Sequence, residues 1–305
     1  MKPLSLLLAL QDNGRETVRA HVGVEATGKP FDAINVADNA LVMNAIAGKD
    51  FRDATSLDRA WGDFAGELNK GVKGLKIALP KQYFGEGISP EVKGAVLEAA
   101  KRYEALGAFV EEADLPALEY ALPAYYVISS AEASSNLARF DGVKYGFRAE
   151  DYEDIDQLYL ATRTQGFGKE VKRRIMLGSF VLSAGYYDAY YKKAMQVRTL
   201  IRKDFEEAFQ KCDVLLTPTS PVTAYPLDAQ MDPLTVYMLD VTTIPVNMAG
   251  LPGISIPCGF VNGMPVGMQL IGKALDEETL LRTAYTFEQA TDFHKAVAPL
   301  GGTNK

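Results

Sequence analysis

The chain has 305 residues, which is long enough for one large domain or two ordinary ones. Hydrophobic residues make up 48% of it and charged residues 23%, a composition typical of folded globular proteins rather than disordered ones. The formal net charge of -7 argues against a surface that neutralises phosphates, so we expect any nucleic acid to be held by a partner.

Cysteine and histidine are too scarce to favour several kinds of site. Cys212 and Cys258 each lie beside an apolar run, and we interpret both as reduced core residues. His21 and His294 are the only histidines, which leaves little material for a histidine metal site or a Ser-His-Asp triad. No stretch is apolar enough to span a bilayer, and the short apolar run near the start lacks a signal-type cleavage site, so we expect a cytoplasmic protein.

Residues 74–110 carry the signals of a βαβ unit. The run GLKIALP (74–80) is short, apolar and closed by proline, as in a buried strand. Ser89 and Pro90 then begin a helix as its N-cap and first residue. Its apolar positions recur at helical spacing up to a stop at Gly107: they are Val92, Val96, Leu97, Ala100 and Tyr103. A second strand begins at residues 108–110, which predicts parallel pairing with a right-handed crossover.

The second half of the chain repeats this alternation. Residues 185–211 predict a long helix with a charged face, and residues 214–216 predict a second buried strand. Residues 253–259 and 264–272 predict paired strands, because the turn between them contains the Asn-Gly dipeptide that favours a hairpin. Asp276 caps the last predicted helix, whose apolar face carries Leu280, Leu281, Ala284 and Phe287.

Strands interleaved with helices indicate an α/β fold whose sheet is covered on both faces. No internal repeat and no low-complexity linker divides the chain. One domain is therefore the simpler interpretation, and it is preceded by a segment, residues 1–36, that shows no clear periodicity.

Two charged positions are candidate ligand contacts. Arg173 and Arg174 lie on a basic helical run and point about 100° apart, so one of them can face inward. An inward arginine offers a planar fork for a carboxylate. Asp240 lies in an otherwise apolar stretch, where burial is costly without a partner. It therefore caps a turn, pairs with an internal arginine, or receives an amine from a ligand.

Other candidates have ordinary structural interpretations. Tyr125 and Tyr126 fit a half-buried core position better than a ligand contact. The run SSAEASSN (129–136) holds four serines but lacks the glycines that would expose a nucleophile or form an oxyanion hole, so we interpret it as a helix start or a serine turn. Neither glycine-rich phosphate-loop pattern occurs, and nucleotide binding by this chain is unsupported.

Several stretches, taken together, resemble one family. They are NAIAGKDFRDATS, GLKIALPKQYFGEGISPEV, AEASSNLARFDGVKYGFRAE, GFGKEVKRRIMLGSFVLSAGYYDAYYKKA, VRTLIRKDF, DVLLTPTSP and NMAGLPGISIPCGF. The similarity covers about residues 37–296 and is to the A subunits of glutamyl-tRNA(Gln)/aspartyl-tRNA(Asn) amidotransferases, within the amidase signature family. It implies an amidase-signature-like α/β/α sandwich with a mixed sheet, incomplete at its N-terminal side, formed by residues 37–305.

The resemblance also implies a glutaminase. The family uses a nucleophilic serine, a bridging serine and an uncharged lysine, with backbone N–H groups holding the oxyanion, and it needs no histidine. The released ammonia passes to a B subunit, where ATP and Mg²⁺ are expected, and a small C subunit tethers the pair. The implied partners are the B and C subunits and glutamine, with tRNA reached only through the complex and no membrane.

The serine and lysine signature of the family is not found in this sequence. In the family it precedes the stretch that resembles NAIAGKD, and residues 1–36 hold no Gly/Ser-rich run. Lys49 follows that region and receives no catalytic role. We therefore expect a truncated glutaminase subunit with no catalytic residue of its own. The alternatives are a noncatalytic relic or binding module that keeps the pocket and partner surface, and an amidase-signature hydrolase of another amide.

Three residues fall at positions of the family's glutamine pocket. By the motif match, Arg174 would hold the α-carboxylate of glutamine and Asp240 its α-amino group, with Tyr125 alongside. This pair of opposite charges suits an amino acid zwitterion.

Overall fold

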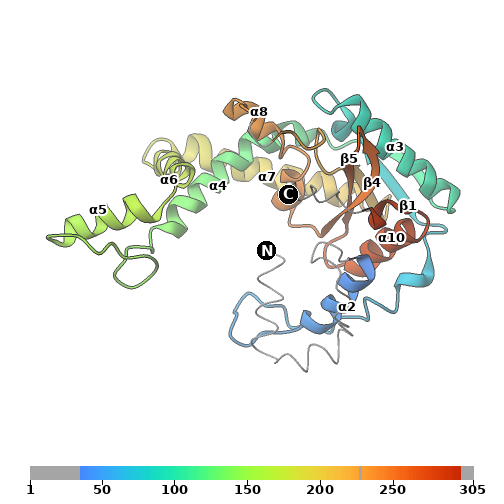
Figure 1. Ribbon diagram of the computed structural model, residues 1–305, viewed down its shortest axis with the longest axis horizontal. Coiled ribbons are helices and arrows are strands. Elements are labelled where there is room, and N and C mark those ends of the chain that lie inside the picture. Colours follow the sequence, from blue (N-terminus) through green and yellow to red (C-terminus); the bar gives the residue numbers. More distant parts are fainter. Residues whose placement is uncertain (1–34, 227–228, 297–305) are drawn as a thin grey trace, which may run out of the picture. The chain divides into compact units, whose positions relative to one another are not determined.

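The computed structural model describes residues 35–226 and 229–296. Two compact units make up the described chain (Figure 1). Unit 1 combines its residues up to 114 with 208–242 and those from 250 onward, whereas unit 2 combines 115–207 with 243–249. The domain boundary predicted after residue 36 stays a prediction, since residues 1–34 lie outside the described residues.

The described residues of unit 1 form a mixed sheet of five strands. Its strands are β1 (Lys76–Pro80), β2 (Phe109–Ala113), β3 (Val214–Pro218), β4 (Gly253–Val261) and β5 (Met264–Gly272). Its helices are α2 (Val36–Ile46), α3 (Pro90–Ala105), α8 (Pro233–Met238) and α10 (Glu277–Gln289), with short 3-10 turns at Leu68–Lys70, Lys81–Phe84 and Phe293–Lys295. The strand order is β2-β1-β3-β5-β4, in which β1 is parallel to β2 and β3, and β5 is antiparallel to β3 and β4.

The βαβ unit predicted over residues 74–110 is confirmed. Helix α3 connects β1 to β2 and begins where its sequence predicts, because the Val92 N–H donates to Ser89 Oγ at 3.3 Å and Pro90 occupies the first position. Gly107 follows the helix with a φ of 92°, a left-handed conformation that favours glycine. Local sequence therefore sets both ends of this connection.

The predicted burial of both faces of the sheet is confirmed at the central strand β3, whose residues are all buried, but not at the edge strand β2, whose residues are exposed or half-buried. One face packs against α3 and α10, which lie beside the β4–β5 hairpin in Figure 1. These two helices also contact each other: the Tyr103 and Phe287 ring centroids are 5.4 Å apart, and the Tyr103 hydroxyl donates to the Thr283 carbonyl at 3.1 Å. On the opposite face, Leu215 and Ile271 are fully buried.

The predicted hairpin and final helix of unit 1 are also confirmed. Asn262 and Gly263 occupy the β4–β5 turn with φ values of 51° and 79°, which Asn-Gly adopts readily. The Asp276 carboxylate accepts a hydrogen bond from the Thr279 N–H at 3.3 Å and so caps α10. Local turn and cap chemistry thus accounts for where the hairpin turns and where α10 begins.

The regular elements among the described residues of unit 2 are all helical, and an irregular segment, residues 138–154, separates α4 from α5. Its helices are α4 (Ala121–Leu137), α5 (Ile155–Gly166), α6 (Lys169–Val181), α7 (Lys192–Ala208) and α9 (Ile244–Ala249), with a 3-10 turn at Pro116–Tyr120 and a π-helical turn at Tyr187–Tyr191. The helix predicted from residue 185 is therefore regular only from Lys192, and the prediction was wrong at its start.

Helices α4 and α6 of unit 2 approach each other unusually closely. A Cβ added at Gly178 of α6 would lie 1.9 Å from the Ser130 carbonyl oxygen of α4. Nearby, the Ser134 and Ser179 hydroxyls are 3.0 Å apart and hydrogen-bonded. The serine run 129–136 therefore lies inside α4, not at a helix start as predicted. Its small side chains let the two backbones meet.

Candidate functional site

Tyr125 and Arg174, two of the three predicted glutamine contacts, lie together in unit 2. Tyr125 comes from α4 and Arg174 from α6. Burial works to lower the pKa of the Arg174 guanidinium, but hydrogen bonds with Glu170 and Tyr125 outweigh it and raise the pKa above its ordinary value. The guanidinium is therefore stabilised in its charged form, and the Arg174 side chain is only 30% exposed.

Further contacts hold the Arg174 guanidinium in place. Its Nε donates to Glu170 Oε1 at 3.2 Å, one turn earlier in α6. Its Cζ lies over the Tyr126 ring, 5.5 Å from the centroid, and that ring meets the Tyr125 ring edge-on at 5.2 Å. The neighbouring Arg173 side chain is 45% exposed. Arg174 is thus the more buried of the two adjacent arginines.

Asp240 lies in unit 1, in the turn that follows α8. Its backbone N–H donates to the Tyr237 carbonyl at 3.3 Å, and its side chain is exposed. The burial expected from its apolar sequence neighbours was wrong, because the turn brings the carboxylate to the surface. No desolvation cost of the kind considered above therefore arises.

A buried polar network fixes this turn at the carboxyl end of β3. Thr242 Oγ1 donates to the Thr219 carbonyl at 2.6 Å. Gln269 Nε2 lies 3.0 Å from both the Thr242 carbonyl and Thr217 Oγ1. Open α/β sheets bind ligands outside the carboxyl ends of their strands. The network therefore sets the Asp240 turn at an edge of the sheet that is typical of binding sites.

The three predicted contacts come from different units: Tyr125 and Arg174 belong to unit 2 and Asp240 to unit 1. Their role in binding glutamine stays a prediction. Sequence reasoning missed Tyr126 and Glu170 as partners of Arg174. The four-residue spacing from glutamate to arginine on a helix was a signal that could have identified the second of these.

The serine run on α4 has the environment of a packing surface. Ser130 is buried at 2% exposure, and the Ser134 hydroxyl is bonded to another serine. Ser129 Oγ is buried without a hydrogen-bond partner. A serine nucleophile needs an adjacent base to activate it. These hydroxyls therefore do not form a catalytic arrangement.

Thiol and metal chemistry gain no support from the described residues. Cys212 and Cys258 are free and buried, as predicted, and burial raises the pKa of each thiol to about 12. Within residues 35–226 and 229–296, no group of three His, Cys, Asp or Glu side chains is arranged to hold a metal ion. Nor does any helix in this part of the chain combine the length and apolarity needed to cross a membrane.

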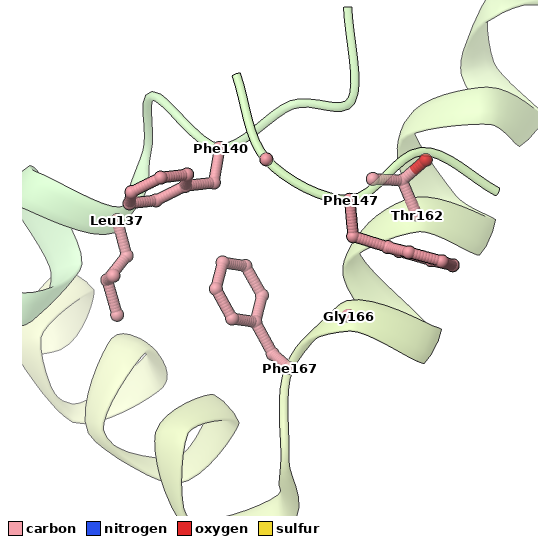
Figure 2. Close-up of a pocket in the computed structure, with 7 residues that line it drawn as sticks. Leu137, Phe140, Phe147, Thr162, Gly166 and Phe167 are labelled. Carbon is pink, nitrogen blue, oxygen red and sulfur yellow. The ribbon is translucent and has the colours of Figure 1, made fainter. Parts of the chain in front are cut away.

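Unit 2 also contains an apolar pocket of about 210 Å³, shown in Figure 2. It is lined by Leu137, Phe140, Gly146, Phe147, Thr162, Gly166 and Phe167. Arg163 secures the surrounding loop by donating to the Leu137 and Phe140 carbonyls at 3.2 and 3.1 Å. Neither Tyr125 nor Arg174 lines this pocket, so it is separate from the candidate glutamine contacts.

Comparison with known proteins identifies relatives over most of the chain. The sequence profile of the Amidase family matches residues 14–281. The A subunit of the glutamyl-tRNA(Gln) amidotransferase of Streptococcus pneumoniae serotype 19F (strain G54) is 55% identical over 289 residues, which cover 92% of this chain and 59% of that protein. Its counterpart in Ligilactobacillus salivarius (strain UCC118) is 56% identical over 270 residues, 88% of this chain and 55% of that protein. The chain thus spans less than two thirds of the length of these relatives.

Solved structures agree with this assignment. The A subunit of the Thermotoga maritima glutamyl-tRNA(Gln) amidotransferase matches with a TM-score of 0.67 and 42% identity, over 84% of this chain and 51% of that chain. A bacterial aryl acylamidase of the amidase signature family matches with a TM-score of 0.68 over 87% of this chain and 54% of that chain, and at 22% identity it shows the fold alone. The predicted amidase-signature-like α/β fold with a mixed sheet is confirmed. The chain belongs to the amidase family.

Proposed function

We propose that this chain is part of the glutaminase subunit of a glutamyl-tRNA(Gln) amidotransferase and that it contributes the glutamine-binding residues. The observation that carries the proposal is the 55% identity to the Streptococcus pneumoniae A subunit over 92% of this chain. The setting of Arg174 supports it, because a partly buried guanidinium held by Glu170 and lying over the Tyr126 ring suits a carboxylate ligand.

Each predicted contact has a chemical task in this proposal. Arg174 binds the α-carboxylate of glutamine, Asp240 accepts the α-ammonium group, and Tyr125 lies alongside as a partner of the guanidinium. Together they select a free amino acid, because neither charge exists on an amide within a peptide chain. Hydrolysis also needs an activated nucleophile and oxyanion donors, and we assign none of these to the chain.

The proposed partners follow from the names of the relatives, which describe them as parts of a larger enzyme. The chain acts with a B subunit, which uses ATP and Mg²⁺ to amidate misacylated tRNA with the ammonia released from glutamine, and with a tethering C subunit. The complex works in the cytoplasm. A noncatalytic binding module and a hydrolase of another amide are the alternatives that an experiment has to separate.

A chimeric protein tests the proposal. The segment of the Streptococcus pneumoniae relative that precedes its match to residue 37 is joined to residues 37–305, the product is purified with B and C subunits, and ammonia release from L-glutamine is measured. We expect glutamine hydrolysis that falls on Asp240→Asn substitution. A folded chimera that hydrolyses only other amides would favour the hydrolase alternative, and one that binds glutamine without turnover would favour the binding module.

A further inference from the structure

The carboxylate of Glu170 contacts the guanidinium of Arg174 at its Nε. We infer that Glu170 is a positioning residue, which holds the Nε side of Arg174 and thereby aims the terminal nitrogens at the α-carboxylate of the substrate. The inference rests on the proposed function, because it deepens the glutamine site assigned there.

The contact geometry divides the guanidinium into two edges. A guanidinium has five N–H donors, one on Nε and four on the two terminal nitrogens. Glu170 Oε1 accepts from Nε at 3.2 Å. Even with the Tyr125 hydroxyl bonded to the same group, donors remain on the terminal nitrogens for a bidentate carboxylate. Glu170 therefore orients the fork without occupying its end.

Glu170 is itself restrained. Its second oxygen, Oε2, lies 3.1 Å from Arg173 Nη1, so the carboxylate bridges two arginines on one helix. The Tyr126 ring, 5.5 Å from Arg174 Cζ, limits motion of the guanidinium out of its plane. Because α4 and α6 meet with almost no gap at Gly178, the ring and the arginine are carried by two rigidly packed helices.

A second arginine–glutamate pair in unit 2 has the same contact geometry in a more exposed setting. Arg202 Nε lies 3.2 Å from Glu206 Oε1 on α7, also four residues apart, and both side chains are 61% exposed. Exposed pairs of this kind contribute little. Arg174, at 30% exposure and over an aromatic ring, has the same ion pair in a confined setting. The difference between the two pairs is therefore the setting and not the contact.

The experiment uses the full 305-residue chain and two ligands. Affinities for L-glutamine and for L-glutaminamide, which lacks the α-carboxylate, are measured by calorimetry for the wild type, Glu170→Ala, Glu170→Gln and the matched control Glu206→Ala. Exchange of the Arg174 Nε–H with water is followed by NMR in the same proteins, and thermal melts check folding.

We expect Glu170→Ala to weaken L-glutamine binding roughly tenfold, to leave L-glutaminamide binding within about twofold, and to speed exchange of the Arg174 Nε–H. Glu170→Gln should recover most of the affinity because its amide oxygen still accepts from Nε, and Glu206→Ala should change nothing. Equal losses for both ligands would reduce Glu170 to a structural role and overturn the inference. So would an unchanged L-glutamine affinity, or a wild-type chain that binds no L-glutamine. The proposed function is tested separately, by the release of ammonia from L-glutamine in the chimeric protein.

Discussion

The identity of residue 174 as arginine, not lysine, is decisive for the proposed site. The ammonium of a lysine is a point charge. It cannot reproduce the planar fork of the guanidinium, nor donate to Glu170 from a separate Nε while its other donors bind a carboxylate. We predict that Arg174→Lys weakens glutamine binding by about 1.5–3 kcal/mol, measured in the chimeric protein. Arg202→Lys, which alters the exposed counterpart pair, serves as the control. An Arg174→Lys protein with wild-type affinity would contradict the assignment.

The ionisation of a second single residue, Asp213, predicts how stability depends on pH. Burial tends to raise its pKa, but hydrogen bonds from the Lys76 N–H at 3.0 Å and Lys273 Nζ at 3.1 Å lower the pKa below its ordinary 3.8. A lowered folded-state pKa adds stability that is present above pH 3.8 and is lost as the pH falls through the folded value. Asp213→Asn should therefore cost about 0.5–1 kcal/mol at pH 7.

Urea unfolding at pH 7 and pH 3 checks this. The difference in the free energy of unfolding between wild type and Asp213→Asn should shrink at pH 3. A difference that stays constant between the two pH values would mean that packing, and not ionisation, accounts for the effect.

At the scale of elements, the approach of α4 to α6 depends on one glycine. A Cβ at Gly178 would lie 2.6 Å from Ser134 Cβ, besides its clash with the Ser130 carbonyl. We predict that Gly178→Ala lowers the free energy of unfolding by about 1–3 kcal/mol through overpacking. Gly94→Ala is the control, since Gly94 lies on α3 with nothing within 4 Å of its added Cβ. There the change should stabilise by up to about 1 kcal/mol.

Elements defined by local chemistry could be predicted from the sequence. Capping at Ser89 and Asp276 and the Asn-Gly turn depend on residues a few positions apart, so the sequence contains the whole cause. Leu97 shows the limit, because helical spacing predicts an apolar position while the side chain is 41% exposed. Helix register relative to a sheet depends on partners far along the chain.

The candidate site divides in the same way. Motif similarity was enough to nominate Arg174, and the four-residue spacing on α6 could have identified Glu170 as its partner. Tyr126 became visible only when α4 and α6 were placed together. The exposure of Asp240 could not be predicted, because hydrogen bonds of Thr242 with residues far along the chain fix the position of the turn that carries Asp240. Local patterns therefore identified charges, and packing determined their surroundings.

For the whole molecule, we predict that this chain alone releases no ammonia from L-glutamine. In the serine run on α4, Ser130 is buried and the Ser134 hydroxyl is bonded to Ser179, while the run lacks the glycine-rich setting that a nucleophilic serine needs. Purified chain is incubated with L-glutamine and ammonia is measured, with the chimera as the active reference. Turnover that disappears on Ser129→Ala or Ser135→Ala would show that a nucleophile had been overlooked.

The sequence of unit 2 interrupts that of unit 1, which bears on how the chain folds on the ribosome. Strands β1 and β2 emerge before β3, which pairs in parallel with β1 and is made only after the segment 115–207 of unit 2. The Lys76 to Asp213 contact closes a loop of 137 positions. The entropic cost of closing this loop precedes the stabilisation that pairing of β1 with β3 provides. Until then the inner edge of β1 stays open to other nascent strands. Translation speed through residues 115–207 therefore sets how long that edge is exposed.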